Sequence, residues 1–132
     1  GRLTLLANSV YTFRSLNTDS GARVIANGPV WIYVTTNSVI HLRGAVLAGT
    51  GQPFGQVFIG APNAFLVTIG ASFQATLVAP RASISADMVI FNEISGSFFV
   101  HDFELHQGRV MRFVPFQRSW IPTCTTSFGG CN

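Results

Sequence analysis

The densest group of side chains that could bind a metal or move protons is His101, Asp102, Glu104 and His106. Imidazole and carboxylate groups are common zinc ligands. In a β-strand, alternate residues share a face, so Asp102, Glu104 and His106 would line one side and His101 the other. Neighbours on that side would lie roughly 6.5–7 Å apart, too far for all three to reach one ion, even if His41 joined from elsewhere. We therefore expect a solvated outer face, with no metal and no cofactor.

Sequence motifs for hydrolysis or phosphate binding are not found. Neither GASFQ (70–74) nor SGSFF (95–99) fits the Gly-x-Ser-x-Gly turn of hydrolases. The glycine-rich stretch GTGQPFG (49–55) contains a proline, and no predicted helix follows it to complete a phosphate-binding loop. The chain has five acidic residues in all, which leaves few pairs for acid–base chemistry. The sequence predicts no catalytic residue, and we expect that the protein is not an enzyme.

Two cysteines, Cys124 and Cys131, lie near the C-terminus on either side of Gly129 and Gly130. The spacing suits a disulfide that closes a short local loop, which would contribute roughly 2–3 kcal/mol. Two free thiols, or bridges to a neighbouring subunit, are the alternatives. A disulfide implies an oxidising compartment, so we expect a secreted, extracellular or cell-surface protein. Because the chain begins at Gly1, we expect a processed form from which any signal sequence has been removed.

The composition combines high hydrophobicity with little charge. Hydrophobic residues make up 48% and charged residues 10%, against about 25% charged in an average soluble domain. No uninterrupted apolar run is long enough to span a membrane as a helix. There is no lysine, and the eight arginines are scattered, whereas a nucleic-acid footprint would be a patch or stripe. We expect a surface covered partly by Ser, Thr, Asn and Gln and partly by other copies of the chain, and no nucleic-acid partner.

Four pairs of a glycine and a small residue follow one another at intervals of 23, 26 and 26 residues. Such a period is typical of repeat architectures. We interpret the glycines as solenoid corners that supply a positive φ, and the small residues after them as a ladder along the axis. The predicted corners are Gly21, Gly44, Gly70 and Gly96, and the predicted ladder is Ala22, Ala45, Ala71 and Ser97.

Between these glycines lie short runs of β-branched and aromatic residues, such as VWIYV (30–34) and FLVTI (65–69). Turn residues bound them every 8 to 12 positions, and no window keeps helical spacing. The sequence therefore predicts an all-β fold, a short right-handed parallel β-solenoid (β-helix) of about four to five rungs. This domain would cover residues 1–116, with 117–132 as a C-terminal tail or cap. A β-sandwich or jelly roll is the alternative.

Three stretches resemble secreted bacterial β-solenoid domains. They are LTLLANSVYTFRSLNTDSGARVIANGPVWIYV (3–34), FQATLVAPRASIS (73–85) and GSFFVHDFELHQG (96–108). Such domains occur in cell-surface and pilus-associated proteins, notably of myxobacteria, and their layout is similar to that of ice-binding-like adhesion domains. One departure is Ala75, where glycine is common. The resemblance spans residue 3 to about residue 116, and it implies a fold and a location but no catalytic residue.

Most of the twelve phenylalanines fall into two groups. Those in predicted strands are expected to stack inside the core: Phe54, Phe58, Phe65, Phe73, Phe98 and Phe99. The C-terminal aromatics would form a packed cap, a contact between subunits or a carbohydrate platform, and we take Phe113, Phe116, Trp120 and Phe128 as self-association candidates.

Solenoid ends carry unpaired strand edges that must be capped or stacked on another copy. The sequence has neither a charged, helical N-terminal cap nor lysine to guard an edge. We therefore expect a homo-oligomeric or polymeric structural subunit of an extracellular fibre or cell-surface assembly. The alternative is a surface adhesin or ligand-binding module, for which a glycan or ice would be the ligand.

Overall fold

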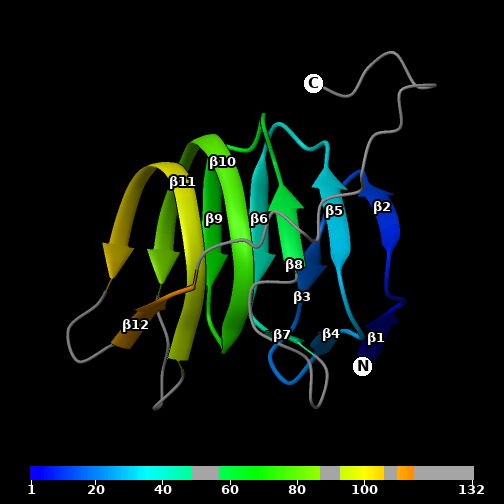
Figure 1. The fold of residues 1–132 in the computed structure, drawn as a ribbon. Helices are drawn as coiled ribbons and strands as arrows, with labels where there is room; N and C mark the ends of the chain where they lie inside the picture. Colours follow the sequence, from blue (N-terminus) through cyan, green and yellow to red (C-terminus); the bar gives the residue numbers. More distant parts are fainter. Residues whose placement is uncertain (49–56, 87–92, 106–109, 115–132) are drawn as a thin grey trace, which may run out of the picture.

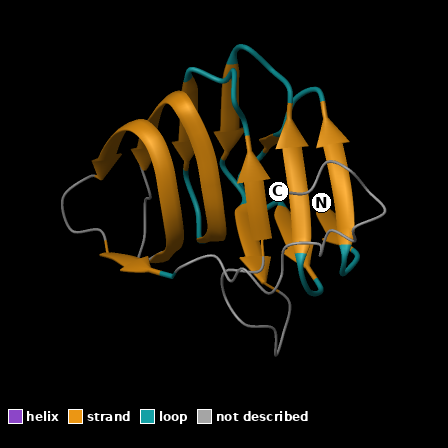
Figure 2. Cartoon of the chain, turned by 45° about the horizontal axis from the view of Figure 1, so that its top comes forward, coloured by secondary structure: helices purple, strands orange, loops and turns teal. Residues whose placement is uncertain are grey.

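A computed structural model of the chain describes residues 1–48, 57–86, 93–105 and 110–114. These residues form twelve β-strands joined by turns, and no helix is found among them (Figure 2). In the same part of the chain, no helix is long and apolar enough to cross a membrane.

The strands build a three-sided coil, and each of the first three turns of the chain contributes one strand to each side (Figure 1). The first side holds β1 (Arg2–Leu5), β4 (Arg23–Ala26) and β7 (Ala45–Ala48). The second side holds β2 (Ser9–Phe13), β5 (Val30–Val34) and β8 (Val57–Gly60). The third side holds β3 (Asn17–Thr18), β6 (Val39–Leu42) and β9 (Leu66–Ile69).

The fourth and fifth coils are single long strands, β10 (Phe73–Ala86) and β11 (Glu93–Leu105). Both bend around the solenoid, as the arched ribbons of Figure 1 show. β12 (Val110–Phe113) pairs with the start of β11 and begins a further coil on the first side. All pairings between the described strands are parallel, with each strand bonded to its equivalent in the next coil. The predicted parallel β-solenoid is therefore confirmed, and the sandwich alternative is wrong.

The core consists of the inward-facing residues of each coil. Because strand residues alternate between faces, every second residue points to the axis and stacks on its equivalent one coil away. On the second side, Ile32 lies beside Ile59, and Ile59 beside Leu77; all three are at most 1% exposed. Alanines are fully buried at the tighter points, as at Ala61 and Ala64. These ladders make a continuous apolar axis from the first coil to the fifth.

The glycines play a different role from the one predicted. Gly21 has φ of +86° in the turn before β4, as a corner glycine should. Gly44 and Gly70 lie at the same corner, between the third and first sides, but neither has a positive φ. Gly96 is no corner, because it lies inside β11 opposite Ala75.

Close approach of neighbouring coils explains two of these glycines. A Cβ on Gly44 would strike the carbonyl oxygen of Ala22 and lie 2.9 Å from its side chain. A Cβ on Gly96 would strike the carbonyl oxygen of Ala75. The predicted ladder of small residues is also wrong in register, because Ala45 is paired with Arg23 and Ser97 with Thr76.

The phenylalanine prediction holds only in part. Phe73 is fully buried, and Phe98 packs partly buried against the core. Phe65 and Phe99 are instead 55% and 64% exposed. Phe58 faces outward and is half-buried, and Phe54 lies outside the described residues. Alternation sets this outcome, because each of these outward phenylalanines follows or precedes an inward aliphatic residue.

Candidate association surfaces

The first coil ends in unpaired strand edges. β1, β2 and β3 pair with β4, β5 and β6 on one side, and no described strand pairs with their other edges. Inward-facing Leu3 is 43% exposed, although Val24, its equivalent in the second coil, is 3% exposed. The backbone groups and apolar side chains at this end are the ones that another coil would cover.

Two aromatic rings cover part of this end. Tyr11 and Phe13 stack with their ring centroids 6.1 Å apart and their planes 11° apart. The Tyr11 hydroxyl accepts a hydrogen bond from the backbone N–H of Leu6 at 3.0 Å, which fixes the ring. Leu5 and Leu16 are buried beneath this cover, at 1% and 8% exposure. The two rings shield side chains, but they do not pair with the outer edges of β1, β2 and β3, which have no partner among the described strands.

Most of the outer edge of the fifth coil also has no partner among the described strands. β12 pairs with β11 only at Glu93–Gly96, so the rest of β11 has no described partner on its far side. Phe98 stacks on Phe73 at 5.6 Å and meets Phe103 edge to face at 4.9 Å. The rings of Phe98 and Phe103 are partly buried against the core. The two ends of the solenoid thus have similar chemistry, with half-covered aromatic rings inside an unpaired parallel edge.

Near the third side, the described charges of the first and fifth coils differ in sign. The first coil carries Arg2 and Arg14 with one acid, Asp19, and all three are exposed. The fifth coil carries exposed Asp102 and Glu104 on its third side, and exposed Arg112 of β12 lies beside it on the first side. Opposite charges on the two ends favour contact between unlike ends, while contact between two first coils would bring like charges together.

The polar cluster predicted from the sequence lies on this negative end. The sequence predicted that His101 lies on the opposite face of the strand from Asp102 and Glu104. Its side chain is instead 69% exposed, because it lies where β11 turns between two sides. Its Nδ1 lies 2.9 Å from Asp102 Oδ2, which also accepts a hydrogen bond from Ser83 Oγ at 2.6 Å. Among the described residues, no three His, Cys, Asp or Glu side chains lie close enough to hold a metal ion. His106 lies outside those residues.

The hydrogen bond from Ser83, and next the one from His101, lower the pKa of Asp102 below its ordinary value. A lowered pKa in the folded state means that the ionised carboxylate stabilises the fold at any pH above the unfolded value. This contribution is lost as pH falls through the folded pKa. In an Asp102→Asn variant, we expect the deficit in unfolding free energy relative to wild type to shrink below about pH 4. Urea denaturation at several pH values measures this, and a deficit that is independent of pH would contradict it.

The outer face of the second side is apolar, which the sequence analysis did not foresee. Val10, Tyr33 and Phe99 point outward and are 59%, 42% and 64% exposed. The Tyr33 ring lies over Gly60 of the next coil, where an added Cβ would be 3.2 Å from the ring. The stretch VWIYV (30–34) carried the signal, because all five of its residues are apolar or aromatic and only alternate ones can face the core.

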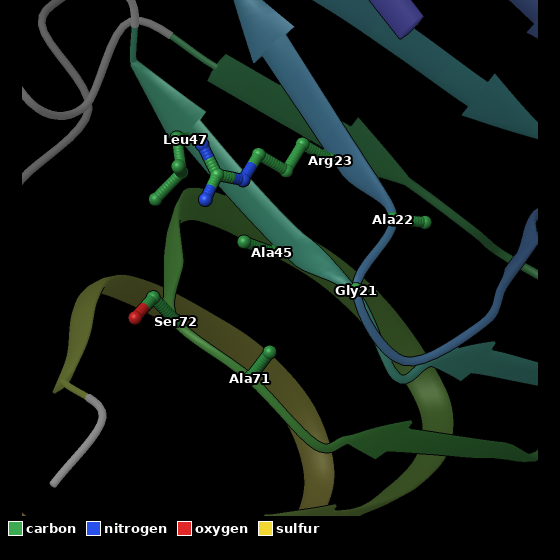
Figure 3. Close-up of a pocket in the computed structure, with 7 residues that line it drawn as sticks. All are labelled: Gly21, Ala22, Arg23, Ala45, Leu47, Ala71 and Ser72. Carbon is green, nitrogen blue, oxygen red and sulfur yellow. The ribbon is translucent and has the colours of Figure 1, made fainter. Parts of the chain in front are cut away.

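A shallow groove of about 390 Å³ crosses the outer face of the first side (Figure 3). The small residues Gly21, Ala22, Ala45 and Ala71 line it, and the Arg23 side chain extends over it toward Leu47. Three of the four predicted small residues, Ala22, Ala45 and Ala71, therefore lie on one surface, although not in strict register, and Ser97 does not. Most of the described lining is small or apolar, so we assign no ligand to this groove.

Most of the predicted self-association residues are not described. Phe113 is the last residue of β12, where its backbone pairs with Gly96. Phe116, Trp120 and Phe128 lie outside the described residues, as do Cys124 and Cys131 with their predicted disulfide, and so does the whole tail 117–132.

No family model, curated protein or solved structure matches this chain.

Proposed function

We propose that this protein is a structural subunit that stacks end to end into an extracellular fibre or cell-surface assembly. The observation that carries the proposal is that, among the described residues, the outer edges of the first and fifth coils have no strand partner beyond β12 and surround partly covered apolar side chains. A further coil on either end would satisfy those backbone groups and bury that apolar surface.

The polarity of the stack follows from charge. Arg14, which lies between β2 and β3 of one copy, would lie near Asp102 on the third side of the next, so the first coil meets the fifth coil of a neighbour. Contact between unlike ends is heterologous and leaves one end free at each extremity, which produces an open filament and not a closed dimer.

Protected edges are the rule in monomeric β proteins, which guard them with lysine, proline or inward-pointing charge. This chain has no lysine, and β1, β2 and β3 contain no proline. The absence of lysine and proline from these strands agrees with an edge that pairs with another copy of the chain. The resemblance to secreted surface domains and the predicted disulfide support an extracellular location.

An ice-binding face is supported less well. Such a face would repeat small hydroxyl residues in register, but one outward ladder of the second side runs Thr12, Tyr33, Gly60, Val78 and Phe99. A fibre subunit therefore explains the described surfaces better than an ice-binding module does.

Sedimentation velocity over a concentration series tests the proposal. We expect the weight-average sedimentation coefficient to rise with concentration without levelling off at a dimer, and electron microscopy of the concentrated protein to show filaments. A single monomeric boundary at every concentration up to the millimolar range would overturn the proposal.

A further inference from the structure

The corner between the second and third sides carries an open depression of about 630 Å³. Its described lining is Asn37 from the second coil, Asn63 and Phe65 from the third, and Arg81 from the fourth. Three successive coils therefore contribute to one surface. Coils are about 4.8 Å apart, so the lining spans roughly 10 Å along the axis.

The backbone holds each contributor in place. Phe65 is fixed between coils, because its N–H donates to Ser38 at 3.2 Å and its carbonyl accepts from Ser83 at 3.0 Å. Buried Ala61 and Ala64 anchor the turn that projects Asn63. The side chain of Thr36 accepts a hydrogen bond from the Ser38 N–H at 3.1 Å, which orders the loop that carries Asn37.

Arg81 reaches this surface through an irregularity in β10. The register between β10 and β11 shifts between Ala79 and Ser83, and the strand turns its corner there with Pro80 and Arg81 exposed. Such bulges commonly re-aim side chains at binding sites. Within the described residues, Asn37, Asn63 and Arg81 make no side-chain hydrogen bond or ion pair, so their polar groups are available to a ligand.

We propose that this depression binds a carboxylate-bearing glycan, such as a chain of uronic acids. The exposed Phe65 ring offers an apolar surface to the C–H face of a sugar ring. Asn37 and Asn63 each offer a donor and an acceptor to sugar hydroxyls. Arg81 offers a planar pair of donors that matches a carboxylate. A few polar groups around an aromatic platform are what an orienting ligand site requires.

No described acid lines this depression. Asp102, in the next coil, is held by Ser83 and His101 and does not line the depression. The protein as a whole carries a formal charge of +3, which attracts an acidic polymer. A fibre subunit with this site would attach to acidic polysaccharide, but the site does not depend on fibre formation.

Isothermal titration with α-1,4-linked trigalacturonate, and with neutral α-1,4-galactotriose as the matched probe, tests the site. The two sugars differ in the carboxylate that replaces each CH₂OH group. We expect the acidic sugar to bind about three- to fivefold more tightly, because an exposed ion pair adds up to about 1 kcal/mol.

Two variants and two controls locate the binding. Arg81→Gln should remove the preference for the acidic sugar, and Phe65→Ala should weaken the binding of both sugars about tenfold. The controls are Phe99→Ala, another exposed phenylalanine, and Arg23→Gln, another exposed arginine, and both should bind as wild type does.

Three results would overturn the proposal. The first is that no heat of binding is measured at millimolar sugar. The second is that the control variants lose as much sugar binding as Arg81→Gln and Phe65→Ala do. The third is tighter binding of a single-stranded oligonucleotide of matched charge, which would mark the surface as a general anion site. Circular dichroism of each variant confirms that binding is compared between folded proteins.

Discussion

Replacing Gly96 by alanine is expected to destabilise the protein by about 3 kcal/mol or more. The added Cβ would strike the carbonyl oxygen of Ala75 and lie 2.9 Å from its carbonyl carbon. Both atoms belong to the backbone of β10, which is paired along most of its length and cannot move without shifting whole coils. For a chain of this size the midpoint of thermal unfolding should fall by roughly 10 °C.

Gly21→Ala is the matched control for that variant. Gly21 has the positive φ, but nothing lies within 4 Å of an added Cβ. Only backbone strain opposes alanine there, at a cost of about 1 kcal/mol. Thermal and urea unfolding of the two variants therefore separate close approach from positive φ as the reason for the glycines. A larger loss at Gly21 than at Gly96 would contradict the register of β10 and β11.

Replacing Thr12 by proline is expected to abolish filament formation and leave the monomer folded. The carbonyl of Phe13 accepts a hydrogen bond from Thr35 in the second coil. Because backbone groups in a parallel strand alternate in direction, the N–H of Thr12 faces the open edge of β2. Proline removes this donor and places its ring where a neighbouring coil would lie, a change that edge strands tolerate. The carbonyl of the neighbouring copy that would accept from this N–H is then unpaired in the interface, at a further cost of about 1–3 kcal/mol.

The control for this variant is Thr12→Val, which keeps both the N–H and the shape of the side chain. We expect Thr12→Val to sediment as wild type does, and Thr12→Pro to remain a monomer at every concentration. Circular dichroism and thermal unfolding of both variants check the fold. If Thr12→Pro assembled as well as Thr12→Val, the first coil could not be an association surface.

The class of fold could be predicted from the sequence because it depends on local features. Short β-branched runs such as VWIYV (30–34), bounded by turn residues, are compatible with few other structures. Gly21, Gly44 and Gly70 also marked one real corner of the solenoid, because the chain returns to the same place once in every coil.

The register could not be predicted, because coils differ in length. Equivalent inward residues Leu3, Val24, Val46, Phe73 and Ile94 are 21, 22, 27 and 21 residues apart. The interval of 26 residues from Gly70 to Gly96 is close to the length of one coil. Gly70 nevertheless lies at a corner, whereas Gly96 lies inside β11. A period found from four glycines cannot show which coil carries an insertion, and it therefore misplaced Gly96.

The candidate sites depend on which face each side chain takes, and that information was only partly in the sequence. Alternation assigns Phe73 inward and Phe99 outward only once the register is known, because a shift of one residue exchanges the two faces. Arg81 approaches Phe65 because β10 turns a corner between Ala79 and Ser83, a local irregularity that no motif announces.

The most direct test of end-to-end stacking mixes two variants that are each blocked at one end. Thr12→Pro blocks the first coil, and the double variant Asp102→Lys, Glu104→Lys reverses the charge of the fifth. Each variant alone should remain monomeric in sedimentation velocity, because every contact needs one intact end of each kind. An equimolar mixture should form a discrete dimer, since one intact first coil and one intact fifth coil are then present. A mixture that stays monomeric, or filaments formed by either variant alone, would contradict the account.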